Sequence, residues 1–102
     1  SVDYPDYAKK VAKRVILRKS DAGILVCGSG TGMAITANRF KGIRAAQCYN
    51  KTSTIFSRKH NNANIICLGS RILKYKEAFK YVTYFLNTKF ESGRHKRRIN
   101  KI

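Results

Sequence analysis

The residues best suited to chemistry form one glycine-rich segment, Cys27-Gly-Ser-Gly-Thr-Gly32, which follows an apolar run. In parallel α/β sheets, ligands bind at the carboxyl ends of strands, and glycines allow a ligand to approach the backbone closely. Successive backbone N–H groups at the start of a helix favour an anion. The segment is not a P-loop, because no Gly-Lys-Ser/Thr follows, and the acidic residue of a dinucleotide site is missing. It predicts either an anion-binding loop or a plain tight turn.

Cys27 stands at the start of this segment, so its thiol has two interpretations. A cysteine next to a helix N-terminus forms a thiolate more readily, and a thiolate can act as a base or a nucleophile. The alternative is a core cysteine, which is the usual state of this residue type. Cys48 and Cys67 fall inside strand-like patterns, and we expect both to be core residues.

Two further groups of residues could take part in a site. His60 ends a helical pattern and precedes Asn61, and its charge could either serve chemistry or simply face the helix dipole. Arg94 and Arg98 are four residues apart, so one helical turn would place both on one side. Paired guanidinium groups suit phosphate oxygens. The alternatives for this basic stretch are a solvated tail and a nucleic-acid-binding tail.

The composition limits the class of protein. The chain has 102 residues, with 22 Lys+Arg against 5 Asp+Glu and a net charge of +17, a length that suits one domain. A pI near 10.3 is in the range of nucleic-acid-binding proteins. The apolar runs are far shorter than the ~18 residues of a membrane span, and no secretion signal is recognisable. The three cysteines form neither a CxxC pair nor a zinc ligand set, so we expect a reducing, cytoplasmic location.

The elements that must position these residues alternate along the chain. Apolar spacing predicts helices over 6–19, 33–40, 51–60 and 74–88. Short apolar runs predict strands over 23–27, 43–48 and 64–68, of which the first and the third are expected to be buried on both faces. We expect Asp6 to cap the first helix and Thr52 or Ser53 the third.

This alternation predicts an α/β fold of one domain, 1–102, with helices on both faces of a parallel sheet and a basic tail over 89–102. Three strands are few, since the mean sheet has about 5–6. The pattern therefore suggests a partial sheet that is completed by further residues or by a partner chain.

Six segments, in this order, resemble the type B ribose-5-phosphate isomerases, whose wider family includes galactose-6-phosphate and allose-6-phosphate isomerases. The segments are Asp3-Tyr-Pro-Asp-Tyr-Ala8, Gly23-Ile-Leu-Val-Cys-Gly-Ser-Gly-Thr-Gly-Met33, Ala37-Asn-Arg-Phe-Lys-Gly-Ile-Arg-Ala45, Ser57-Arg-Lys-His-Asn-Asn62, Leu68-Gly-Ser-Arg71 and Gly93-Arg-His-Lys-Arg-Arg98. The resemblance extends through all 102 residues.

The resemblance implies a three-layer α/β/α sandwich that is Rossmann-like but binds no dinucleotide. It implies a homodimer or homotetramer whose active sites are shared between two subunits. The implied reaction interconverts an aldose phosphate and a ketose phosphate through an enediolate, with no metal and no other cofactor. Ribose 5-phosphate is the favoured substrate, because Cys27 occupies the position of the family's base.

The resemblance also implies roles for individual residues. Cys27 would move the proton between C1 and C2, and Ser29 would lie near the reacting oxygens. His60 would open the sugar ring from the neighbouring subunit, and Asn61 would hold a hydroxyl. The residues implied to contact substrate or phosphate are Asp3, Tyr4, Gly28, Gly30, Thr31, Gly32, Arg71, Arg94 and Arg98.

One departure from the family pattern affects these expectations. The chain begins at the Asp3-Tyr-Pro motif, so the first strands of the family fold and an Asp-His segment are absent. The strand that ends at Cys27 should then be an edge strand. An inactive remnant of the enzyme, or a basic nucleic-acid-binding module, is the alternative function. Because Tyr75 and Phe79 are expected on a buried helix stripe, nucleic-acid binding is the less favoured one.

Overall fold

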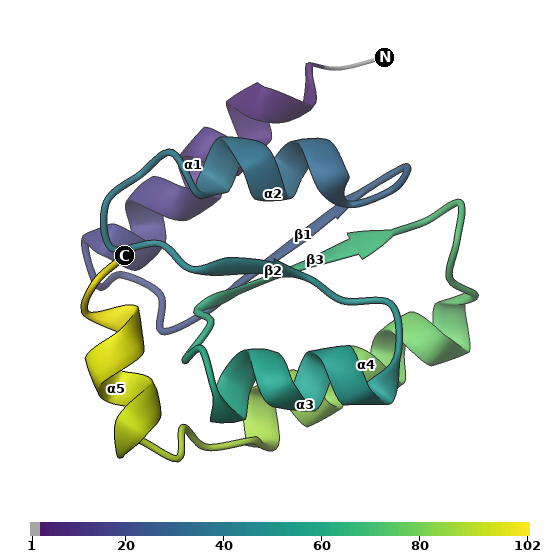
Figure 1. Ribbon diagram of the computed structural model, residues 1–102. Coiled ribbons are helices and arrows are strands. Elements are labelled where there is room, and N and C mark those ends of the chain that lie inside the picture. Colours follow the sequence, from purple (N-terminus) through teal and green to yellow (C-terminus); the bar gives the residue numbers. More distant parts are fainter. Residues whose placement is uncertain (1–2) are drawn as a thin grey trace.

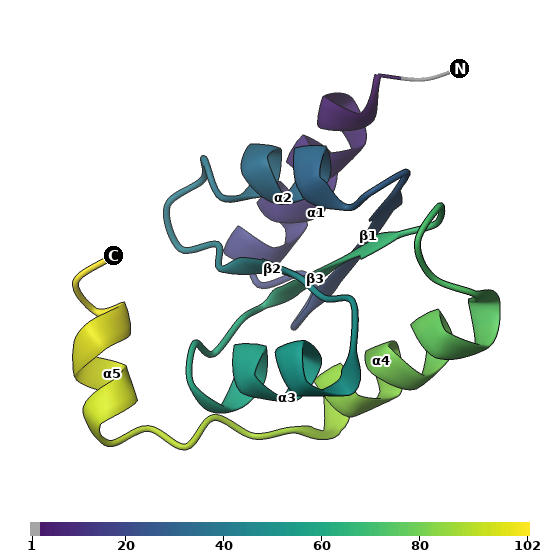
Figure 2. The same ribbon diagram turned by 45° about the vertical axis from the view of Figure 1, so that its right-hand side comes forward.

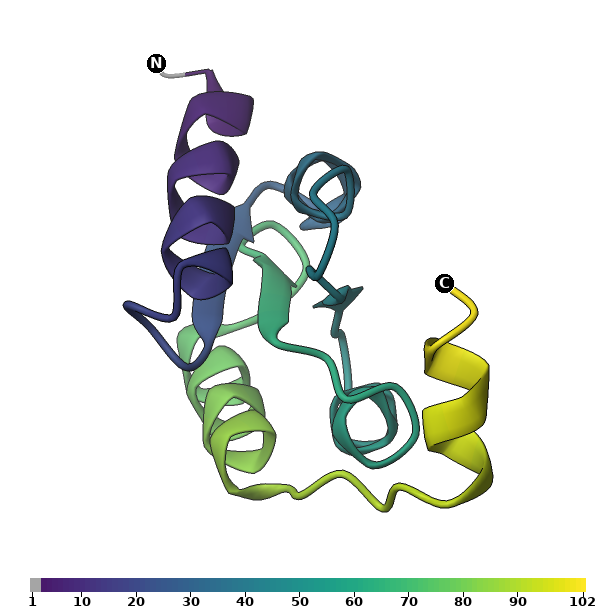
Figure 3. The same ribbon diagram turned by 90° about the vertical axis from the view of Figure 1, so that its left-hand side faces the viewer.

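Helices and strands alternate because apolar spacing switches repeatedly between a helical and an extended period. The computed structural model describes residues 3–102. In chain order, the elements are α1 (Tyr4–Ile16), β1 (Gly23–Cys27), α2 (Thr31–Ala37), β2 (Ala45–Gln47), α3 (Lys51–Lys59), β3 (Ile65–Gly69), α4 (Tyr75–Asn87) and α5 (Arg94–Ile99). The predicted three-layer sandwich is confirmed. Helices α1 and α2 cover one face of the sheet, and α3 and α4 cover the other (Figure 1, Figure 3).

The sheet has the order β1-β3-β2, and both pairings are parallel. β3 is central, and all five of its residues are buried. β1 is an edge strand of the sheet formed by residues 3–102, as predicted. The prediction that β1 is buried on both faces is wrong, because Ile24 and Val26 are 45% and 52% exposed. These two side chains lie on the face of the sheet that is packed against α4, and α4 covers them only in part.

Two apolar layers hold the sandwich together. In the first, buried residues of α1 and α2, such as Ala12 and Met33, pack against Leu25 and Cys67 of the sheet. In the second, Phe85 of α4 packs against Cys48 and residues of β3. The core positions predicted for both cysteines are thus confirmed. Burial raises the pKa of Cys67 to about 12, so this thiol stays protonated.

Local chemistry sets helix starts that differ from the predictions. α1 begins at Tyr4 with Pro5 in its first turn, so Asp6 lies inside the helix and does not cap it. Proline is favoured in the first turn because backbone N–H groups there have no acceptor within the helix, so the N–H that proline lacks costs no hydrogen bond. α3 is capped by Asn50, whose Oδ1 accepts from Ser53 N at 2.7 Å, and not by Thr52 or Ser53. Ser53 instead completes the capping box.

The aromatic stripe of α4 is buried only toward the end of the helix. Phe85 is 2% exposed, whereas Tyr75 and Phe79 are 84% and 64% exposed, so the predicted burial of these two is wrong. The first turns of α4 extend past the end of the sheet (Figure 1). Tyr75 and Phe79 also line a groove of about 440 Å³ between α4 and the sheet, together with Ile24 and Val26 of β1.

The predicted basic tail, 89–102, contains one short helix. α5 lies beside the end of α3, as the turned views show (Figure 2, Figure 3). None of the helices formed by residues 3–102 has the length and apolar character that crossing a membrane requires.

We expect Phe85→Ala to lower the free energy of unfolding by about 3–5 kcal/mol, because it leaves a cavity in the second apolar layer. Phe79→Ala, on the same helix but exposed, should cost less than about 1 kcal/mol. Urea unfolding followed by circular dichroism measures both. Equal losses for the two variants would contradict this description of α4.

Candidate functional site

The glycine-rich loop joins the carboxyl end of β1 to α2 and is held by the end of β3. Ser70 N donates to Cys27 O at 2.8 Å, and Arg71 N donates to Gly28 O at 3.0 Å. A Cβ on Gly69 would lie 2.7 Å from Ser29 O, so only glycine allows this close approach. Gly30 has φ +84°, which also favours glycine. The loop is therefore a defined structure and not merely a flexible connection.

Gln47 of β2 fixes the loop from the other side. Its Nε2 donates to Ser29 O at 2.8 Å and to Thr31 Oγ1 at 2.9 Å. Thr31 N donates to Ser29 Oγ at 3.2 Å. The Ser29 hydroxyl hydrogen is thereby left to serve another acceptor.

The thiol of Cys27 lies inside the turn and is partly exposed. Gly30 N donates to Cys27 Sγ at 3.2 Å. A backbone donor at this distance stabilises negative charge on sulfur. The turn therefore holds the sulfur in a defined position.

Beside the thiol is a cavity of about 480 Å³. Its lining residues are Tyr4, Cys27, Gly28, Ser29, Gly32, Arg71 and Ile72. A Cβ on Gly28 would lie 3.2 Å from Arg71 Nε, so the Arg71 side chain crosses directly over the loop. The Tyr4 ring comes closer still to Gly32, because a Cβ on Gly32 would lie 2.6 Å from its Cε1 atom. Asp3 occupies the N-cap position of α1, beside Tyr4, with an exposed side chain.

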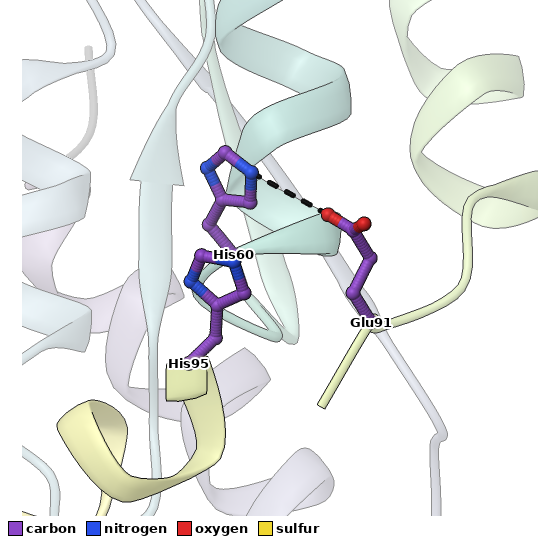
Figure 4. Close-up of side chains that lie close together, drawn as sticks. All are labelled: His60, Glu91 and His95. Atoms are coloured by element: carbon purple, nitrogen blue, oxygen red, sulfur yellow. Dashed lines mark ion pairs between the residues drawn. The ribbon is translucent and has the colours of Figure 1, made fainter. Parts of the chain in front are cut away.

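A second group of residues surrounds the end of α3. His60 is the C-cap of that helix, and its ring stacks between Phe56 at 4.5 Å and His95 at 4.3 Å between centroids. His60 Nε2 lies 3.5 Å from Glu91 Oε1 (Figure 4). Partial burial and the neighbouring positive charges of His60 and Arg94 lower the pKa of His95.

Arg94 and Arg98 both belong to α5 and are exposed, so the predicted single helical turn is confirmed. Asn61 is exposed directly after His60. This second group thus brings four predicted site residues to one region of the surface.

The two groups lie at opposite ends of the sheet. Cys27 ends β1, and parallel strands all end at the same edge. α3 connects two parallel strands, so it must run back and end near their starts. Figure 1 shows the loops after β1 and β3 on one side and α5 on the other.

Three contributors to the second group were not predicted. Glu91 and His95 are far from His60 in the sequence, and they lie beside it because the chain returns to the end of α3 after α4. His95 also stands in a run of basic residues that is typical of a solvated tail. Arg58 supports the turn after α3 by donating to Thr88 O at 3.0 Å and to Asn62 Oδ1 at 3.0 Å. Burial, with the charge of Arg44, lowers the pKa of Arg58. No local feature of the sequence indicates that Arg58 is half-buried next to carbonyl groups.

Comparison with known families decides the classification. The family model described as Ribose/Galactose Isomerase matches residues 1–102. This chain belongs to that family. A putative sugar phosphate isomerase of Rickettsia bellii is 48% identical over 102 residues, which are 100% of this chain and 71% of the relative. Ribose-5-phosphate isomerase B of Escherichia coli is 43% identical over 100 residues, 98% of this chain and 67% of the relative.

Solved structures of isomerases share the fold of this chain. A ribose 5-phosphate isomerase of Thermotoga maritima is 52% identical with a TM-score of 0.97, covering 99% of this chain and 70% of its own. The Clostridium thermocellum ribose-5-phosphate isomerase B has a TM-score of 0.98 at 46% identity, covering 99% and 68%. The predicted family and fold class, and the prediction of an enzyme of the isomerase class, are confirmed. The roles of single residues stay predictions.

We expect iodoacetamide to modify Cys27 in the native protein at pH 8 and to leave Cys48 and Cys67 unmodified. Cys27 is partly exposed, whereas the other two are buried, and burial raises both of their pKa values. Mass spectrometry of tryptic peptides measures the modified sites. Cys27→Ala is the matched control and should take up no label until urea is added. Rapid labelling of Cys48 or Cys67 in the folded chain would contradict this assignment.

Proposed function

We propose that the protein catalyses aldose–ketose isomerisation of a phosphorylated sugar, with ribose 5-phosphate and ribulose 5-phosphate as the substrate pair. The observation that carries the proposal is the partly exposed Cys27 thiol, which accepts from Gly30 N and borders a cavity beside Arg71. The family supports the reaction class. A related ribose-5-phosphate isomerase B from Mycoplasma genitalium, 44% identical with a TM-score of 0.95, has been solved with bound ribulose-5-phosphate.

In the proposed mechanism, the Cys27 thiolate removes the proton from C2 of the open-chain aldose. Electrons of that C–H bond form the C1–C2 double bond of an enediolate, and negative charge develops on the oxygen at C1. The same thiol then returns the proton to C1. The proton of the hydroxyl at C2 passes to the oxygen at C1, which gives the ketose. No bond to the protein forms, and the atoms balance without an oxidant or reductant.

The loop residues stabilise the enediolate. In this proposal, backbone N–H groups of the loop donate to the oxygen at C1, and a donor of this kind contributes about 3–4 kcal/mol in other enzymes. The Ser29 hydroxyl, which accepts from Thr31 N, donates its own hydrogen to a reacting oxygen. The rigid hydrogen bonds to β3 and Gln47 keep these donors in place during the reaction.

Substrate binding uses both ends of the sheet, and therefore two chains. Arg71 is near Cys27, whereas the ring-opening His60 and the phosphate-binding Arg94 and Arg98 are at the far end. A homodimer in which the α3–α5 end of one subunit meets the loop end of the other completes the site. Tyr4 and Asp3 border the site beside the loop, and Asn61 holds a substrate hydroxyl next to His60.

We expect the purified chain, with a chelator present, to convert ribose 5-phosphate to ribulose 5-phosphate. Cys27→Ala should lower kcat by about 10²–10⁴, because the step loses its base, while KM changes little. The assay follows ribulose 5-phosphate formation, with circular dichroism to confirm folding. A folded, dimeric chain without activity, or full activity in Cys27→Ala, would overturn the proposal.

The shared site has its own test by complementation. Cys27→Ala and His60→Ala chains, each inactive alone, are mixed and allowed to exchange subunits. Half of the dimers then contain one chain of each variant. Each of these dimers has one of its two sites with both residues intact, so about a quarter of the unmodified activity should return. If both residues of a site came from the same chain, no activity would return on mixing.

A further inference from the structure

We propose that His60, Glu91 and His95 form a binding site for one zinc-type transition-metal ion, which fastens α5 to the end of α3. The ligand atoms of these three residues lie within 4.8 Å of one another (Figure 4). They come from three segments, namely the end of α3, the linker after α4 and the first turn of α5. The two histidines are partly buried and the glutamate is exposed, so an ion can enter from solvent.

The donor set selects the kind of ion. Two imidazoles and one carboxylate suit zinc and its first-row neighbours, and three protein ligands leave a fourth position for water. Mg²⁺ and Ca²⁺ prefer an all-oxygen set of ligands, which this cluster does not supply.

Metal binding requires the two histidine rings to leave their stack. His60 and His95 are stacked at 15° between ring planes, so their nitrogen lone pairs lie in nearly parallel planes. Both rings would have to rotate about their Cβ–Cγ bonds for one nitrogen of each to face the same ion. Glu91 is already 3.5 Å from His60, and Glu91 N donates to Lys59 O at 3.0 Å, which holds the linker against α3. The backbone therefore brings all three ligands together before any ion binds.

Binding has a consequence for activity that rests on the proposed function. The ion occupies the imidazole of His60, which is the residue proposed to open the sugar ring. It also fixes α5, which carries Arg94 and Arg98. Zinc should therefore inhibit the isomerase, and a chelator should restore its activity.

Direct binding is the first test. The full chain at pH 7.5 is titrated with Zn²⁺ in competition with a chromophoric chelator, and one ion per chain should bind. Mg²⁺ should not compete, and Co²⁺ should give the visible absorption of a four-coordinate site. Hydrogen exchange in α5 should slow when Zn²⁺ is added. The absence of stoichiometric binding would overturn the proposal.

Variants locate the site. His95→Gln and Glu91→Gln should each weaken Zn²⁺ binding by about 10-fold or more. Glu77→Gln is a matched control, because it makes the same change on α4, where glutamine can also serve in the capping box. Cys27→Ser tests whether the thiol is the true ligand, and binding should persist in it. Binding that survives both cluster variants is adventitious and would overturn the site.

The activity measurement separates this proposal from the function on which it rests. An active isomerase that Zn²⁺ neither binds nor inhibits would overturn the metal site and leave the function standing. Zn²⁺ bound at the cluster of an active enzyme without inhibition would support the site and contradict the ring-opening role of His60. Inhibition that disappears in His95→Gln supports both.

Discussion

The parallel pairing of β1 with β3 is the interaction on which the rest of the structure depends. It places Cys27 opposite Gly69, and it allows the residues after β3 to bind the loop after β1. The contact is so close that a Cβ at Gly69 would meet the backbone of Ser29. The contact between these two strand ends determines where the Cys27 thiol, Arg71 and the cavity beside them lie.

Apolar packing, and not ion pairing, stabilises the sandwich. With 22 basic and 5 acidic residues, most charges have no opposite charge to pair with, and the one ion pair formed within 3–102 joins His60 and Glu91. An excess of positive charge repels itself and opposes folding, but it attracts anions. Both proposed halves of the active site carry arginines that such an anion would meet.

The sequence predicted some features well because they are encoded locally. β1 was predicted with its observed bounds, since Gly23 and the glycines after Cys27 mark both ends of the apolar run. The cap of α3 was missed, because Asn50, Thr52 and Ser53 are all good capping residues and only the backbone conformation selects one. Exposure of Phe79 was missed for a different reason, because a helical stripe shows which residues share a face but not how far the sheet extends beneath them.

By itself, the sequence determined the alternating α/β architecture, the family and the loop that carries Cys27. These depend on spacing between neighbours in the chain, which hydrophobic periodicity and turn residues record directly. Only the tertiary structure decided that Cys27 and His60 lie at opposite ends of the sheet, and that His60, Glu91 and His95 converge. The first depends on the direction in which each strand and helix runs. The second depends on contacts between segments that β3 and α4 separate in the sequence. A pattern of neighbouring residues does not specify either.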